Sequence, residues 1–208
     1  DSSHQLVNMM PSPVCFGRHM GFEFESFAED YLSDLRRTLS EVSKSQIEAL
    51  WVELTAVAER RGSIHMIGNG GSAATPSHSA GDWSKELGIP TIAHTDNISS
   101  FTAWANDTDY ANVFAGQLST FAKSGDLVIA YSGSGNSANV LNGISVAKEA
   151  GCRTAAVTGD YNGGKGGELA KIVDVAIVVP TTSMERIEDM QLIINHIVKE
   201  ATKANNEQ

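Results

Sequence analysis

The sequence predicts an α/β fold, with a five-stranded parallel sheet sandwiched by helices in a flavodoxin-like, doubly wound arrangement. Two observations carry this prediction. From residue 63 onward, short apolar runs alternate with stretches of helical periodicity, and glycine- or serine-rich turns directly follow two of the runs. Strands that alternate with helices of crossover length pair in parallel, and helices then cover both faces of the sheet.

The expected elements follow from the spacing of the apolar residues. Strands are expected at residues 63–67, 91–94, 127–131, 153–157 and 175–179. Helices are expected at residues 76–87, 98–105, 110–121, 138–150, 168–172 and 184–204. Thr75 is the expected N-cap of the first of these helices, because Pro76 suits the first helical position.

Two amphipathic helices are expected at residues 22–42 and 45–61, before any strand. They cannot be crossovers of the sheet, so we expect them to pack on the outside of the domain or to pair with another subunit. A chain of 208 residues has room for one complete core. Residues 21–208 are therefore expected to form a single domain that includes this helical pair.

Residues 1–20 differ from the rest, because their apolar side chains follow no period. We expect them to be a disordered leader that is not native, with the natural start at Met20. The alternative is a native extension that becomes ordered on a partner.

The composition limits the class of partner. The formal net charge is −10, which disfavours nonspecific binding to nucleic acid or to an anionic membrane. The two cysteines, Cys15 and Cys152, are too few for a disulfide framework, and no apolar run reaches the ~18 residues of a membrane span. We therefore expect a cytoplasmic protein.

The most informative segment is the loop from Ser132 to Ser137, which lies between an apolar run and a helical pattern. Such a loop aims backbone N–H groups and a helix N-terminus at an anion. It has no Lys or Arg, so it is not a nucleotide P-loop. We expect it to hold one phosphate monoester, although a plain connector could have the same composition.

A second turn of this kind, Gly68 to Ser72, follows the strand expected at residues 63–67. It lacks the G-x-G-x-x-G spacing, so a dinucleotide is not expected. Two such turns at the carboxyl ends of parallel strands predict a ligand site at that edge of the sheet. Asn106 and Asp107 follow the neighbouring strand, and they either close a helix or reach sugar hydroxyls.

Two pairs of side chains suit a metal or proton transfer. His78 and Asp82 lie four residues apart on one helix face, where they either chelate a divalent ion or form a plain hydrogen-bonded pair. Glu188 and His196 lie ~12 Å apart along one helix, so they reach a single metal only at full stretch, or more easily from two subunits. Alternatively, Glu188 belongs to an acidic surface run and His196 is a half-buried core residue.

Together these segments resemble the SIS (sugar isomerase) domain, and more closely the phosphoheptose isomerases. Those enzymes interconvert sedoheptulose 7-phosphate and an aldose heptose 7-phosphate. The serine loop alone is shared by SIS proteins in general, whereas the glycine turn with its downstream His, and the acid and His of the last helix, narrow the match to the heptose group. The matching residues include Gly68 to Ala74, His78, Ala105 to Asp107, Ser132 to Ser137, Arg186 to Asp189 and His196.

The resemblance implies an aldose–ketose isomerase that uses zinc and works as a homotetramer with active sites between subunits. It implies that the phosphate is held by Ser132, Gly133, Ser134 and Ser137. It implies that the rest of the substrate is contacted by Asn69, Gly70, Gly71, Asn106 and Asp107. The implied zinc ligands are His78, Asp82, Glu188 and His196, of which Asp82 and His196 also form the acid/base pair.

Two positions depart from the family pattern. Asp82 stands where better-known members have Glu, and the missing methylene moves the carboxylate by ~1.5 Å. Glu188 stands where many members have Gln, and this added carboxylate could take over the role of base. Because a neutral Gln cannot be a base, the family pattern favours Asp82. The alternative class of function is a non-catalytic SIS protein that binds a sugar phosphate, or a partner such as the bacterial replication initiator.

Overall fold

The structure is a computed structural model in which residues 17 and 21–207 are described. The leader predicted for residues 1–20 lies, apart from residue 17, outside the described residues. The chain divides into two compact units, residues 1–35 and 36–208. The single domain expected for residues 21–208 therefore stays a prediction.

The described part of the first unit contains the beginning of helix α2 (Phe24–Glu41), as its apolar periodicity predicts. Several large apolar side chains of this segment are exposed, among them Phe22, Phe24 and Phe27. The rings of Phe22 and Phe27 lie 5.8 Å apart.

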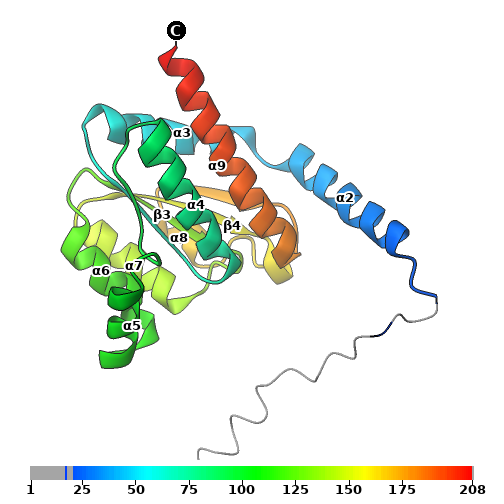
Figure 1. Cartoon of the computed structure of the whole chain (residues 1–208), viewed down its shortest axis with the longest axis horizontal. Coiled ribbons are helices and arrows are strands. Elements are labelled where there is room, and N and C mark those ends of the chain that lie inside the picture. Colours follow the sequence, from blue (N-terminus) through cyan, green and yellow to red (C-terminus); the bar gives the residue numbers. More distant parts are fainter. Residues whose placement is uncertain (1–16, 18–20, 208) are drawn as a thin grey trace, which may run out of the picture. The chain divides into compact units, whose positions relative to one another are not determined.

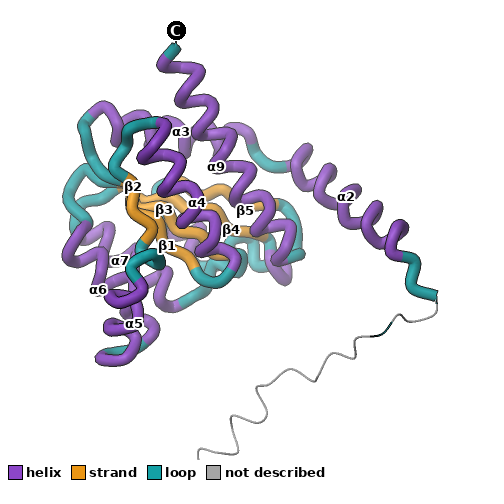
Figure 2. The backbone as a smooth tube through the Cα atoms, viewed as in Figure 1, coloured by secondary structure: helices purple, strands orange, loops and turns teal. Residues whose placement is uncertain are grey.

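The second unit is built on a sheet whose five strands are all parallel, in the order β2-β1-β3-β4-β5 (Figure 2). This is the flavodoxin-like, doubly wound order, so the predicted fold class is confirmed. The strands are β1 (Ile64–Gly68), β2 (Thr91–Ala93), β3 (Leu127–Ser132), β4 (Arg153–Gly159) and β5 (Val175–Val179).

Helices cover both faces of this sheet (Figure 1). One face is covered by α3 (Lys44–Glu59), α4 (Gly71–Glu86) and α9 (Met184–Asn206). The other face is covered by α6 (Val113–Phe121), α7 (Ala138–Glu149) and α8 (Leu169–Ile172), and α5 (Ile98–Asp107) packs on α6. Two 3-10 turns, Tyr110–Asn112 and Tyr161–Gly163, lie in the connections.

The core lies along the central strands. Strands β1 and β3 are buried over their whole length, as expected for parallel strands that are covered on both faces. Side chains such as Ile67, Val128 and Ile144 are fully buried, and each contributes roughly 1.5–3 kcal/mol of hydrophobic free energy. Among the described residues, no helix combines the length and the apolar character of a membrane span.

The beginning of α4 differs from the prediction. The helix starts at Gly71 with Gly70 as its N-cap, so Thr75 and Pro76 lie inside it. Gly70 has a φ of 56°, which glycine adopts with little strain, and this conformation turns the chain directly from β1 into the helix. The prediction that Thr75 caps the helix was therefore wrong. The other predicted boundaries shift by small amounts at the element ends, where assignments commonly vary.

Candidate active site

The glycine turn and the serine loop lie side by side at the point where the strand order reverses. Strands β1 and β3 are neighbours, with Gly68 paired to Tyr131, so the turns that follow them leave the same edge of the sheet. Open α/β sheets bind ligands at such a switch point. The two turns found in the sequence are thus brought together by the fold.

A pocket of about 250 Å³ lies between these two turns. All the residues of the two turns that were predicted to contact substrate line it, whereas Asn106 and Asp107 are not part of the lining. Those two lie at the end of α5, where the Asn106 amide donates to Asp107 Oδ1 at 2.8 Å. The lining residues are Asn69, Gly70, Gly71, Ser72, Tyr131, Ser132, Gly133, Ser134, Ser137, Met184 and Glu188.

The serine loop is folded by its own hydroxyls. Ser132 Oγ accepts a hydrogen bond from the Gly135 N–H at 3.1 Å, and Ser134 Oγ accepts one from the Asn136 N–H at 3.3 Å. Because both hydroxyls are acceptors here, their protons are left to donate elsewhere. Ser137 is the N-cap of α7, yet its side chain makes no capping hydrogen bond. The loop therefore offers hydroxyl donors and a helix N-terminus to one anion.

Two hydrogen-bond partners, which the sequence did not reveal as such, hold the side chain of Asn69 at the pocket. Its Oδ1 accepts hydrogen bonds from Tyr110 Oη and Asn139 Nδ2, each at 2.9 Å, and its Nδ2 donates to Asn139 Oδ1 at 2.9 Å. Asn139 is buried in the first turn of α7. The sequence signal for this role was the position of Asn139 directly after the serine loop.

Glu188 lies against the glycine turn. A Cβ atom at Gly71 would overlap the Glu188 carboxylate, so the absence of a side chain at position 71 admits the carboxylate to the pocket. Burial, together with the nearby charges of Glu185 and Asp189, raises the pKa of Glu188 above its ordinary value. Glu188 is therefore a more basic carboxylate than an exposed one.

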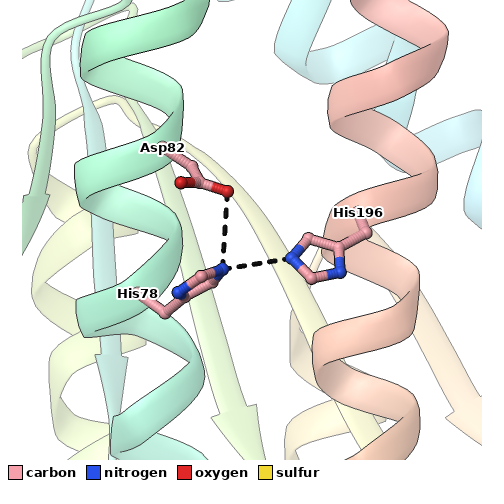
Figure 3. A group of neighbouring side chains, drawn as sticks. All are labelled: His78, Asp82 and His196. Carbon is pink, nitrogen blue, oxygen red and sulfur yellow. Dashed lines mark hydrogen bonds and ion pairs between the residues drawn. The ribbon is translucent and has the colours of Figure 1, made fainter.

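His78, Asp82 and His196 converge in the space between α4 and α9 (Figure 3). His78 Nε2 lies 3.1 Å from His196 Nε2 and 3.4 Å from Asp82 Oδ2. Two ligand atoms bound to one tetrahedral zinc ion lie ~3.3 Å apart, so these separations fit a shared ion. Two imidazoles and a carboxylate are also ligands that zinc accepts. Glu188 is not a member of this group of mutually close ligand atoms among the described residues.

Sequence reasoning also missed Lys199. Its Nζ donates to Asp82 Oδ2 at 3.0 Å and to Glu86 Oε1 at 3.4 Å. The hydrogen bond from Lys199 and its charge hold the pKa of Asp82 below the ordinary value. The available signal was spacing, because Lys199 lies three residues after His196 and so shares its helix face.

Comparisons with known proteins agree with this geometry. The SIS domain family matches residues 29–159. A probable phosphoheptose isomerase of Thermoplasma volcanium is 36% identical over 174 residues, which cover 81% of this chain and 87% of the relative. The phosphoheptose isomerase of Aliarcobacter butzleri is 34% identical over 172 residues, which cover 80% of this chain and 85% of the relative.

A solved structure gives the same result. Phosphoheptose isomerase GmhA from Neisseria gonorrhoeae superposes with a TM-score of 0.80 at 26% identity, covering 88% of this chain and 100% of that one. Because the family match spans most of the chain and the curated relatives match over most of their own length, the chain belongs to the SIS domain family and, within it, to the phosphoheptose isomerases.

Proposed function

We propose that the protein is an isomerase that interconverts sedoheptulose 7-phosphate and D-glycero-D-manno-heptose 7-phosphate through an enediol. One observation carries the proposal: the two helices that hold the His78–Asp82–His196 group, α4 and α9, also contribute residues to the lining of the anion pocket. Gly71 and Glu188 mark the pocket near the N-termini of α4 and α9, and His78 and His196 follow seven and eight residues later. That is ~10–12 Å of helix, the scale of an extended seven-carbon sugar phosphate.

The residues divide into binding and chemistry. Ser132, Gly133, Ser134 and Ser137 hold the phosphate, and Asn69, Gly70 and Gly71 contact the sugar. Fixing the phosphate orients the carbon chain of the sugar, so that the carbon next to the carbonyl faces the proton-transfer group.

The chemistry is the removal of a proton from the carbon next to the carbonyl and its return to the neighbouring carbon. Asp82 is the proposed base, and His196 exchanges a proton with the substrate oxygen that becomes negative. Glu188 is the second candidate base, since its raised pKa favours proton abstraction.

The proposed metal is zinc, held by His78, Asp82 and His196, with Glu188 completing the site. When bound, zinc would polarise the substrate carbonyl. The separations of 3.1 Å and 3.4 Å within the group support this assignment.

We further propose a cytoplasmic homotetramer with active sites between subunits. Within one chain Glu188 stands apart from the metal group, and Asn106 and Asp107 stand apart from the pocket lining, so a second copy has contacts to supply. The exposed phenylalanines of α2 support an apolar contact between copies. Cys152 is a free, buried thiol, which suits a reducing compartment.

Incubation with sedoheptulose 7-phosphate in deuterium oxide tests the activity directly. Proton NMR should show new aldose signals and the loss of the proton on the carbon next to the carbonyl. Binding of the sugar phosphate with no aldose and no exchange would support the non-catalytic alternative instead.

A further inference from the structure

A ladder of charges joins α4 to α9 beside the proposed metal site. Asp82 and Glu86 lie on α4, and Lys199 and Lys203 lie on α9. Lys199 Nζ lies 3.0 Å from Asp82 Oδ2 and 3.4 Å from Glu86 Oε1, and Lys203 Nζ lies 3.0 Å from Glu86 Oε2. The Lys199 side chain is only 11% exposed, so its ammonium is held in the ladder rather than in open solvent.

One atom of this ladder also belongs to the group formed by His78, Asp82 and His196. Asp82 Oδ2 is the oxygen that lies 3.4 Å from His78 Nε2, and the same oxygen accepts the hydrogen bond from Lys199. A divalent ion bound by Asp82 Oδ2, His78 and His196 would therefore lie close to the Lys199 ammonium. Two positive charges at such a distance repel each other, most strongly where water is partly excluded.

We propose that Lys199 is an internal cation that competes with a divalent metal for Asp82. The ammonium keeps the carboxylate in place in the absence of metal and makes the site a weak, readily exchanged one. Glu86 gives Lys199 a second partner, so the ammonium moves from Asp82 to Glu86 when a metal binds. This inference rests on the proposed metal site but not on the isomerase activity.

Cobalt(II) is a suitable probe, because a site with two imidazoles and a carboxylate gives visible absorption bands that report binding without any assay of activity. Titration of Lys199→Met should show Co²⁺ binding about tenfold tighter than in the unchanged protein, since one nearby positive charge is removed. Lys199→Gln, which is uncharged but polar, should show the same gain. Lys199→Arg, which keeps the charge, should stay weak.

Lys203→Met is the matched control. It removes a lysine of the same ladder that pairs with Glu86 and Glu200, so its Co²⁺ affinity should stay close to that of the unchanged protein. His78→Ala should abolish the absorption bands, which assigns them to this site. In an Asp82→Asn background, Lys199→Met should tighten binding less than it does in the unchanged protein, because the competition for the shared carboxylate is gone and only the repulsion between the two cations is relieved.

Equal or weaker Co²⁺ binding by folded Lys199→Met and Lys199→Gln would overturn the role of Lys199 while leaving the metal site in place. Failure of every variant to bind Co²⁺ would overturn the metal site and this inference together, even if the isomerase assay succeeds. An equal gain in Lys203→Met would also contradict it, because the effect would then be general charge rather than competition at Asp82.

Discussion

Within the described residues, two sets of two histidines and one aspartate have nearly equal contact distances. In one, His65 Nδ1 lies 3.0 Å from His94 Nε2, and His65 Nε2 lies 3.3 Å from Asp126 Oδ2. In the other, His78 Nε2 lies 3.1 Å from His196 Nε2 and 3.4 Å from Asp82 Oδ2. Contact distance therefore does not distinguish them.

The two sets are distinguished by which ring nitrogens make the contacts and by how exposed the side chains are. His65 uses opposite nitrogens of its ring for its two partners, so the three groups form a line and their ligand atoms cannot meet at one ion. His78 uses one nitrogen for both partners, so the ligand atoms converge.

The two sets also differ in exposure. His65 and His94 are each 1% exposed, whereas the His78 side chain is 50% exposed. The first arrangement suits a structural hydrogen-bond chain, and the second suits an ion or a substrate that arrives from solvent.

The largest expected effect tests the set formed by His78, Asp82 and His196. Asp82→Asn keeps the size of the side chain but removes the proposed base, so turnover and solvent exchange of the substrate proton should fall by ~10²–10⁴-fold. Proton NMR in deuterium oxide measures both. Glu188→Gln is the matched variant and should keep measurable turnover. Survival of exchange in Asp82→Asn together with its loss in Glu188→Gln would transfer the role of base to Glu188.

The equivalent change in the buried set, formed by His65, His94 and Asp126, should act on stability instead. Asp126 accepts hydrogen bonds from the backbone N–H groups of Ser63 at 2.8 Å and Lys123 at 2.9 Å, as well as contacting His65. An Asn has one oxygen fewer, so Asp126→Asn should lower the free energy of unfolding by ~2–4 kcal/mol. Urea denaturation measures this loss.

Turnover per folded molecule should be retained in Asp126→Asn, because the residue is not part of the proposed site. Asp96→Asn, at an exposed position, is the control and should change stability by less than ~0.5 kcal/mol. A large loss of turnover in folded Asp126→Asn would contradict the division between the two sets.

The buried set also predicts a dependence of stability on pH. Burial lowers the pKa of His65, and burial with the nearby His65 lowers the pKa of His94 to about 4 from 6.5. The unfolded chain therefore binds more protons than the folded chain between pH 6.5 and about 4, and stability falls as the pH falls through this window. For His94 the loss reaches about 3 kcal/mol, at roughly 1.4 kcal/mol for each pKa unit.

Denaturation curves at several pH values between 7.5 and 4.5 test this expectation. His94→Gln should flatten the fall, because it removes the imidazole whose pKa burial lowers to about 4. A stability that stays constant across the window would show that these imidazoles are already protonated or are more accessible than their burial indicates.

What the sequence predicted well is local in the chain. The strands appear as contiguous apolar runs, and the glycine turn and serine loop directly follow two of them, so fold class and pocket both came from short segments. The beginning of α4 was missed because a glycine with positive φ supplied the cap, a role that composition alone did not distinguish from a longer loop.

The set formed by His78, Asp82 and His196 was only partly predictable from the sequence. His78 and Asp82 stood out through their spacing of four residues, but His196 lies 118 residues away from His78 and joined them through the family resemblance. Helix α9 brings it there by packing on α4, a long-range contact that no periodicity encodes. Lys199 was missed for the same reason, since its importance comes from the partner on the facing helix.

The smallest expected effect concerns the pocket, whose serine loop offers neutral hydroxyl and backbone N–H donors rather than imidazoles. Ser134→Ala removes one hydroxyl donor to a charged group and should weaken the binding of a sugar phosphate by ~1–2 kcal/mol. Isothermal titration with sedoheptulose 7-phosphate measures the change. Ser119→Ala is the control, because Ser119 Oγ donates to Gly116 O on α6, and should leave affinity unchanged. Equal affinity in Ser134→Ala and the unchanged protein would mean that the backbone N–H groups and the N-terminus of α7 hold the phosphate without this hydroxyl.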